Sequence, residues 1–279
     1  MEKPPVTLKV LLTFSVLSLV FIGVSYVSSF SDNSTRVVFC DVGQGDGTYI
    51  RVENKIDIVI DAGSDKKILN CLAEHMPFYD RKIEIAFMTH PDYDHYGGFL
   101  HIFDRYSVER VITVPLEVKK SSYLKLQGKI KKRGTLVQNL YAGDSINFSK
   151  SSIRFLWPEA GYVLENANKN LPTNSFSQVF IYSEGAFDIL FTGDYELDYR
   201  IKNKLNVDIE ILKVPHHGSK DGLNSEILTV SKPEVAVISV GKGNSYGHPH
   251  QSILDLLEAS KIEILRTDEK GDIKFKLSK

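Results

Sequence analysis

The chain has 279 residues, of which 42% are hydrophobic and 25% are charged, and its formal net charge is -1. This length fits one large domain or two small ones, and the composition is typical of a globular protein. A net charge this close to zero excludes any argument that the overall charge of the molecule selects its partner.

The two cysteines, Cys40 and Cys71, are too few for a disulfide framework, and their spacing matches no cysteine-based zinc motif. We expect them to be buried thiols. The alternative is a single bridge between them, which requires that the domain is exported to an oxidising compartment.

The N-terminal segment differs from the rest of the chain. Residues 10 to 30 carry no charged side chain and are rich in Leu, Val and Phe. An apolar run of this length can cross a bilayer core of ~30 Å as a helix. Lys3 and Lys9 precede this run, so the positive-inside rule places the remainder of the chain outside the cytoplasm. We favour an uncleaved anchor over residues 1–30. The alternative is a cleaved signal peptide, for which Val27 and Ser29 are tolerable, although no A-x-A site is present.

A short polar linker is expected at residues 31–35, followed by one domain over residues 36–279. In its first half the patterns predict strands at 36–41, 47–52, 57–61, 83–88 and 110–114, with helices at 66–75 and from Gly97 to Phe103. In its second half they predict strands at 178–183, 187–192, 209–214, 234–240, 263–267 and 272–277, with helices at 196–205 and 252–259. Alternating strands and helices in both halves imply an α/β fold of sheets covered by helices.

Polar side chains follow five of these predicted strands. Asp61, His90, Asp194, His216 and His248 each come at or just after the end of a hydrophobic run. Loops at strand ends, held by a rigid scaffold, are common places for functional sites. We therefore expect these side chains to meet in one metal-binding cleft.

The stretch HPDYDH places His90, Asp92, Asp94 and His95 within six positions, and Gly97 and Gly98 follow it. Imidazole and carboxylate groups together suit Zn²⁺ or Mn²⁺. Four such ligands are too many for one metal with an open position, but they suit half of a two-metal site, in which the ions lie ~3.5–4 Å apart. The alternative is a charged surface turn.

Three later motifs supply further candidates. FTGD ends in Asp194, which either bridges two ions or occupies a hairpin turn or helix N-cap. VPHHGS contains His216 and His217, of which one would bind metal and the other protonate a leaving group, unless both are ordinary surface histidines. In SYGHPH either His248 or His250 is a ligand or begins a helix. His75 and His101 lie in helical patterns away from any motif and are expected to be structural.

HPDYDH followed by two glycines resembles the H-x-[HD]-x-D-H signature of the metallo-β-lactamase fold superfamily. DVGQGD, IDAGS, FTGD, PHHGS and YGHPH resemble more specifically the hydrolase domain of the ComEC competence family, in the same order and from about residue 36 to the end of the chain. The resemblance implies a four-layer αβ/βα sandwich with the site at its rim and two bound divalent metals. The metal ligands that it implies are His90, Asp92 and His216 for one ion, Asp94, His95 and His248 for the other, and Asp194 bridging both.

The resemblance also implies roles around the metals. Asp94 and His217 are the expected catalytic residues, and Asp46 and Asp61 are expected to support the ligands from behind. The side chains expected to face substrate are Asn174, Ser177, Ser219 and Lys220.

Two features depart from the family pattern. Asp92 stands where the superfamily most often has histidine, and this harder ligand leaves Mn²⁺ open beside Zn²⁺. The many membrane helices of full ComEC proteins are not found in this sequence, so we do not expect this chain itself to be a DNA channel.

Between Val118 and Gly143 the chain has a run of basic side chains and no acidic one. This run predicts either contact with phosphates or the solvated face of an amphipathic helix with Leu124, Leu126 and Ile130 turned inward. Tyr123 offers one ring for base stacking. The basic residues are Lys119, Lys120, Lys125, Lys129, Lys131, Lys132 and Arg133.

Three hypotheses follow for function. The first is a membrane-anchored, extracytoplasmic two-metal phosphodiesterase or nuclease that acts on an anionic phosphodiester such as single-stranded DNA. The second is a hydrolase of cell-wall phosphodiesters of the teichoic-acid type, or of another ester or amide. The third is a non-catalytic accessory of a DNA-uptake complex.

Overall fold

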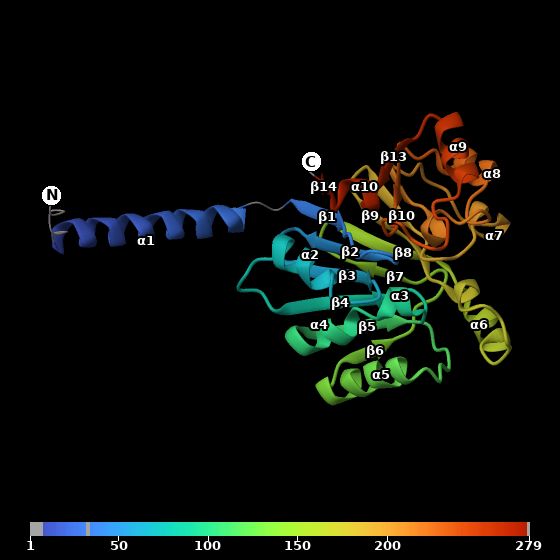
Figure 1. Ribbon diagram of the computed structural model, residues 1–279, viewed down its shortest axis with the longest axis horizontal. Coiled ribbons are helices and arrows are strands. Elements are labelled where there is room, and N and C mark those ends of the chain that lie inside the picture. The colour runs from blue at the N-terminus through green and yellow to red at the C-terminus, as the bar shows by residue number, and fades with distance from the viewer. Residues whose placement is uncertain (1–7, 32–33, 278–279) are drawn as a thin grey trace.

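A computed structural model describes residues 8–31 and 34–277, without the side chains of Leu8, Ile22 and residues 24–31. Two seven-stranded sheets form the centre of the molecule (Figure 1). The first sheet has the order β14-β1-β2-β3-β4-β5-β6. Its strands are β1 (Thr35–Phe39), β2 (Gly47–Val52), β3 (Ile56–Ala62), β4 (Lys82–Met88), β5 (Ser107–Thr113), β6 (Leu136–Gln138) and β14 (Ile273–Leu277).

The second sheet has the order β13-β12-β11-β10-β9-β8-β7. Strands β10, β11, β12 and β13 are parallel to one another, and the remaining pairs are antiparallel. Its strands are β7 (Ser145–Asn147), β8 (Ser151–Trp157), β9 (Val179–Glu184), β10 (Phe187–Phe191), β11 (Ile211–Lys213), β12 (Val235–Ile238) and β13 (Glu263–Arg266).

Helices cover the outer faces of the two sheets. The helices that follow strands of the first sheet are α2 (Ile68–His75), α3 (Tyr93–Tyr96), α4 (Phe99–Arg105) and α5 (Ser121–Arg133). The second half of the chain contributes α6 (Ala160–Asn166), α7 (Tyr199–Lys202), α8 (Ser225–Ser231), α9 (Gln251–Ala259), α10 (Thr267–Lys270) and the 3-10 helices η1 (Thr173–Phe176) and η2 (Pro215–Gly218).

Three large hydrophobic cores separate these layers. One lies between the sheets, where the rings of Phe87, Phe155, Phe180 and Phe191 stack against one another. The other two lie between each sheet and its helices. Neighbouring residues of one strand, such as Ile58 and Val59, enter different cores. The strands are therefore buried on both faces, which explains their continuous apolar runs.

This arrangement is the predicted two-sheet α/β sandwich. The predicted helix at 196–205 is wrong in extent, because α7 is a single turn and Leu197 instead packs into the core as part of a loop. Strands β6, β7 and β8 were not predicted. The three-residue strands β6 and β7 have too few residues to show a period, whereas β8 alternates in burial like a strand and was missed. On α5, Leu124 is turned outward and Tyr123 is buried, the reverse of what we expected, so Tyr123 offers no ring for stacking.

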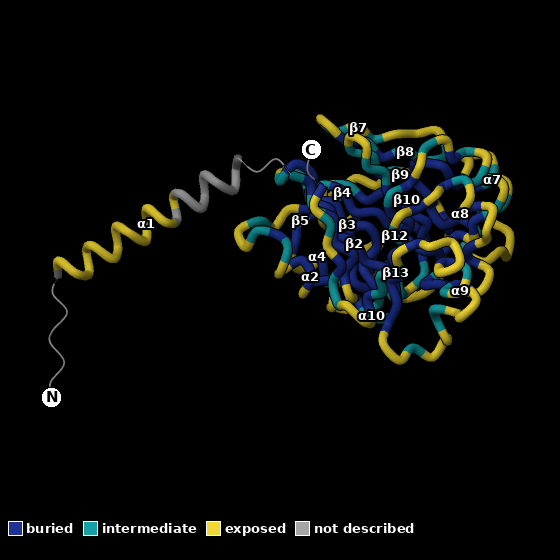
Figure 2. The backbone as a smooth tube through the Cα atoms, turned by 90° about the horizontal axis from the view of Figure 1, so that it is seen from above, coloured by how far each residue is buried: buried dark blue, intermediate teal, exposed yellow. Residues whose placement is uncertain are grey.

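Helix α1 (Leu8–Ser31) extends away from the sheets (Figures 1 and 2). Within the part of the chain that the structure describes, no helix is at once long and apolar enough to span a bilayer. The predicted anchor falls partly on residues 1–7 and on side chains that lie outside this description. Of the predicted linker, Ser31 is the last residue of α1 and Thr35 the first of β1, while residues 32–33 lie outside the described chain.

The two cysteines form a disulfide bond, so the expectation of two free thiols is wrong. Cys40 follows β1 and Cys71 lies on α2. Packing of α2 on the first sheet brings their Cα atoms to 5.8 Å, within the range that a disulfide requires. The sequence alone does not show where a helix comes to rest on a sheet, which is why the pair could not be assigned from it.

We expect reduction of this bond to lower the free energy of unfolding by about 2–4 kcal/mol, because it closes a loop between residues 31 positions apart. Urea denaturation with and without a reducing agent measures the difference. A variant with both Cys40→Ser and Cys71→Ser is the control and should be insensitive to the reducing agent. An unchanged wild-type midpoint after reduction would show that the bond contributes nothing.

Candidate metal centre

The strand directions gather the predicted site residues at one edge of the sandwich. Strands β3 and β4 are parallel, so their C-terminal ends, with Asp61 and His90, lie side by side. In the second sheet β10, β11 and β12 are parallel as well. The segments that follow them carry Asp194, His216 and His248 to the same edge, which we call the rim.

The glycines after HPDYDH permit this gathering. A Cβ atom at Gly98 would overlap the backbone carbonyl of Ala62, so only glycine lets the chain pass beneath the end of β3. Three non-glycine residues at the rim have left-handed backbone conformations: Asp61, His216 and His217 have φ angles of 52°, 49° and 55°. Such unfavourable backbone is common where side chains must be aimed at a site.

His95 is oriented by Asp61. Its Nδ1 lies 2.8 Å from Oδ2 of Asp61, and both side chains are completely buried. The carboxylate also accepts hydrogen bonds from the backbone N–H and hydroxyl of Thr89, at 2.9 and 2.7 Å. Since a carboxylate accepts the Nδ1 proton, the Nε2 lone pair of His95 is turned toward the cluster.

His90 and His217 are oriented in the same way. Nδ1 of His90 lies 3.1 Å from the hydroxyl of Thr89 and 3.2 Å from that of Ser177. Nδ1 of His217 lies 2.9 Å from the carbonyl oxygen of Ser239, which can only accept. In His217 the proton therefore resides on Nδ1, and in both rings Nε2 faces the same cluster as in His95.

Asp194 lies at the centre of these rings. Its Oδ2 is 3.2 Å from Nε2 of His95, 3.7 Å from that of His217, and 3.8 Å from those of His90 and His216. The Asp194 side chain is 4% exposed. One carboxylate facing four imidazoles is the arrangement expected of a ligand that bridges two cations.

Several buried polar atoms of this cluster have no hydrogen-bond partner within the described chain. They include Nε2 of His90, His95 and His217 and Oδ1 of Asp194. Buried polar atoms are normally satisfied, so these atoms fit divalent cations as their missing partners. Ligand atoms within 4.8 Å of one another occur in four overlapping sets here: His90–His95–Asp194, Asp94–His95–His217, Asp46–Asp61–His95 and Asp46–Asp194–His217.

The remaining predicted ligands lie around this centre. Asp92 is 29% exposed, with Oδ2 at 3.7 Å from Nε2 of His90. His216 is 30% exposed, with Nδ2 of Asn174 at 3.4 Å from its Nε2. The ring of His248 lies 5.6 Å from that of His216, and its Nδ1 has no hydrogen-bond partner among the described residues.

The structure changes the predicted positions of His217 and Ser177. His217 was expected to be a catalytic residue at the substrate, but its side chain is 2% exposed and its Nε2 lies 3.4 Å from Oδ2 of Asp94. Its Nε2 also lies 3.7 Å from Oδ2 of Asp194. Ser177 is fully buried behind the cluster and accepts a hydrogen bond from the backbone N–H of Asp194. Ser219 is nearly buried, and Lys220 is exposed.

The model of the metallo-beta-lactamase superfamily matches residues 40–242. The chain belongs to this superfamily. Among curated relatives, ComE operon protein 3 of Bacillus subtilis (strain 168) is 30% identical over 86% of this chain and 33% of its own length. Recombination protein 2 of Haemophilus influenzae is 27% identical over 94% of this chain and 31% of its own length.

The chain thus spans about a third of the length of those relatives. The predicted resemblance to the ComEC competence family is confirmed at this level. Among solved structures, the metallo-beta-lactamase fold protein YhfI from Bacillus subtilis superimposes with a TM-score of 0.61. The match covers 88% of this chain and 100% of that chain at 11% identity, which shows a shared fold alone.

Burial and neighbouring charges shift the pKa values of the histidines in this centre. Burial alone would lower the pKa of His217, but the carboxylates of Asp194 and Asp46 outweigh it and raise the pKa to about 9. Asp194 and Asp61 likewise raise the pKa of His95 against the effect of burial. Burial and the neighbouring His95 lower the pKa of His90 to about 4. Cations that bind these rings must displace protons, so metal affinity should fall as the pH falls.

Lys213 was missed by the sequence analysis. This lysine of β11 is 3% exposed, and its Nζ forms an ion pair with Oδ2 of Asp46 and donates to the carbonyl of Gly193 at 3.0 Å. Asp46 in turn has Oδ1 at 3.2 Å from Nδ1 of His217. The pair therefore supports His217 from behind. A lysine at the end of an apolar strand, IEILKV, was the available signal, because such a position is seldom charged.

We expect Lys213→Met to lower the free energy of unfolding by about 3 kcal/mol, since it leaves the buried carboxylate of Asp46 without its cation. Chemical denaturation measures this loss. Lys232→Met, at an exposed pair with Asp208, is the matched control and should cost at most about 0.5 kcal/mol. Equal costs at both lysines would contradict the role of Lys213.

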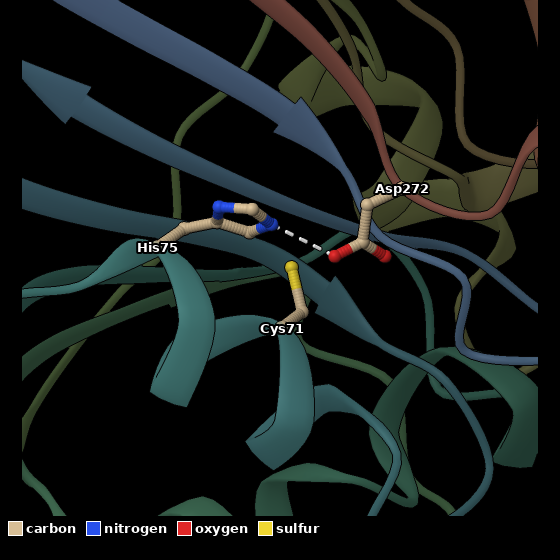
Figure 3. A group of neighbouring side chains, drawn as sticks. All are labelled: Cys71, His75 and Asp272. Carbon is tan, nitrogen blue, oxygen red and sulfur yellow. Dashed lines mark hydrogen bonds and ion pairs between the residues drawn. The ribbon is translucent and has the colours of Figure 1, made fainter.

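A second group of potential ligands, Cys71, His75 and Asp272, shares no residue with the metal centre (Figure 3). Nε2 of His75 is 2.8 Å from Oδ2 of Asp272, whose Oδ1 accepts from the backbone N–H of Asp41 at 2.7 Å. The sulfur of Cys71 is bonded to Cys40 and is not a thiolate. The group thus links α2, the segment after β1 and the start of β14, in line with the structural role expected for His75.

Proposed function

We propose that the chain is a hydrolase that uses two divalent metal ions, Zn²⁺ or Mn²⁺, to cleave an anionic phosphodiester. The observation that carries this proposal is the set of three buried imidazoles whose Nδ1 atoms are held and whose unpartnered Nε2 atoms face Asp194. A packed core gains nothing from such a set, because each unpartnered polar atom costs stability.

The ligands divide between two ions. One ion would be held by His90 and Asp92, with His216 completing the set, and the other by Asp94, His95 and His217. Asp194 would be shared between them, given its distances to all four imidazoles. In this assignment His217 replaces the predicted His248. Two such ions activate water and stabilise the attacking and leaving oxygens of a displacement.

The protein supplies the surroundings of that reaction. Asp61, Thr89, Ser177 and the Ser239 carbonyl hold the imidazole rings in position. His248 lies at the rim beside His216, where it can contact substrate.

Positive charge at the mouth of the centre favours an anionic substrate. Nζ of Lys120 is 3.5 Å from Oδ1 of Asp92, and this lysine is exposed where α5 begins. From there α5 carries further lysines and Arg133 along its surface. Together with Lys220, they suit the phosphates of a strand such as single-stranded DNA. The likeness to competence proteins supports a role near DNA-uptake machinery. The uncharged apolar run over residues 10–30 supports a membrane anchor and an extracytoplasmic domain.

Metal content and two substrates test the proposal. The purified chain should contain about two divalent ions, and it should cleave bis-p-nitrophenyl phosphate and single-stranded DNA in a Mn²⁺- or Zn²⁺-dependent way. Cleavage of the small diester without cleavage of DNA would favour a cell-wall phosphodiester as substrate. Absence of bound metal would support a non-catalytic accessory instead.

Lys120→Gln tests the substrate class. It should raise KM for DNA more than KM for the small diester, because only the polymer reaches the basic surface. Lys169→Gln, an exposed lysine outside that surface, serves as the control. Equal effects on both substrates would contradict the contact with a polyanion.

A further inference from the structure

One edge of the first sheet, opposite the rim, carries an exposed aromatic pair. Strands β1, β3, β4, β5 and β6 run in the same direction, so their first residues share this edge, which we call the base. The loop that leads into β4 contains Phe78 and Tyr79, whose side chains are 84% and 55% exposed. Their rings contact each other edge to face, with centroids 5.4 Å apart.

A hollow lies directly beside this pair. It has a volume of 540 Å³, and apolar side chains of α2 and the loop form one part of its wall. Arg81, Arg105 and Tyr106 form the other part. The hollow is therefore apolar on one side and cationic on the other. Its lining consists of Leu69, Ala73, Met76, Phe78, Arg81, Arg105 and Tyr106.

The two arginines are available to a ligand. Arg81 lies over the ring of Tyr106, with its guanidinium carbon 5.4 Å from the ring centroid, and donates weakly to the Tyr106 hydroxyl at 3.5 Å. Both arginines are exposed, and neither pairs with a carboxylate of the described chain. The nearby Asp80 is engaged by Arg51 at 3.3 Å.

The base is also where the N-terminal segment joins the domain. Helix α1 ends at Ser31 and β1 begins at Thr35 on this edge. In Figure 1 the loop between α2 and β4 lies on the same side of the sheets as α1, and α3 at the rim lies on the other side. A membrane that holds the apolar segment 10–30 would therefore face the base and leave the rim open to substrate.

We propose that Phe78, Tyr79, Arg81 and Arg105 dock the domain on the surface of that membrane, and that the hollow holds the headgroup of an anionic phospholipid. Aromatic side chains favour the region between headgroups and acyl chains, and arginines favour anionic phosphates. This inference rests on the membrane anchor in the proposed function, and it adds a second contact that orients the catalytic rim away from the bilayer.

Fluorescence quenching of the full chain in vesicles tests the docking. Phe78→Trp, in vesicles of anionic phospholipids with brominated acyl chains, should lose roughly half of its added emission, because a docked ring lies ~5–10 Å deep at the interface. Leu164→Trp is the matched control: Leu164 is also 84% exposed, on α6 in the second half of the chain, and should be quenched little. The buried Trp157 of the parent chain supplies the background to subtract.

The arginines are tested in the Phe78→Trp chain. Arg81→Gln with Arg105→Gln should reduce the docked-to-undocked ratio by roughly tenfold or more in anionic vesicles, and should change it little in zwitterionic ones. Lys169→Gln with Lys242→Gln, two exposed cations away from the base, should have no effect. Competition by soluble glycerol phosphate that abolishes the quenching would mean that the hollow binds free phosphate, which overturns the lipid assignment.

Two measurements distinguish the docking of the base from the membrane anchor. Resistance of the full chain to alkaline extraction from membranes reports on the anchor alone. Equal quenching of the Phe78→Trp and Leu164→Trp chains overturns the docking whether or not the chain resists extraction. Stronger quenching at position 78 supports the docking in either case.

Discussion

Asp194→Asn should reduce hydrolysis of a phosphodiester by about 10³-fold or more and lower the metal content from about two ions per chain to below one. The substitution keeps the size of the side chain and removes its charge. The expected loss of metal and activity follows from the position of Oδ2 of Asp194, which lies 3.2–3.8 Å from Nε2 of four histidines. Without that charge, neither cation has the ligand that it would share.

Mass spectrometry of the metal content and the rate with bis-p-nitrophenyl phosphate measure this effect. Asp208→Asn, at an exposed aspartate paired with Lys232, should leave both quantities unchanged. Far-ultraviolet circular dichroism should show that both variants are folded. A folded Asp194→Asn chain with two bound ions and full activity would refute the shared-ligand role.

His217→Ala should remove the ion that Asp94 and His95 also hold and lower activity by about 10²-fold or more, whereas His248→Ala should retain both ions. The two histidines differ in how deeply they are buried and in how close their ring nitrogens lie to the carboxylates. Nε2 of His217 lies 3.4 Å from Asp94 and 3.7 Å from Asp194, and its Nδ1 is held by the Ser239 carbonyl. His216 and His217 both lie within 3.8 Å of the Asp194 carboxylate, whereas His248 forms no ion pair with a carboxylate of the described residues.

Cobalt substitution distinguishes the two histidines directly. Titration of metal-free protein with Co²⁺ should give two equivalents of the visible absorption in the His248→Ala chain and about one in the His217→Ala chain. His101→Ala, at a helical histidine outside the site, is a third reference. The opposite pattern, with loss of an ion only in His248→Ala, would restore the ligand set expected from the sequence.

Much of the centre could be predicted because its residues follow strands. Asp61, His90 and Asp194 stand directly after strong apolar runs, and parallel strands bring such ends together in any sheet of this class. The signature HPDYDH needed only the local chain, since a turn and Gly98 suffice to bring its side chains together. These parts required no knowledge of how the layers pack.

Other parts depended on packing that no local pattern records. The two adjacent histidines of PHHGS were expected to have a ligand and a substrate-facing role. The left-handed backbone at His216 and His217 turns both rings toward Asp194 and buries the second. Lys213 looked like a strand residue, and only the approach of the loop before β2 supplies Asp46 as its partner.

The sequence by itself determined the alternation of strands and helices, the positions of the histidines and aspartates at strand ends, and the superfamily, because these depend on composition and spacing along the chain. Tertiary structure alone decided that Cys40 bonds Cys71, that His217 is buried beside Asp94 while His248 is only half-buried, and that Phe78 stands exposed beside two arginines. Each of these depends on distances between segments far apart in the chain, which are set by how helices and sheets pack.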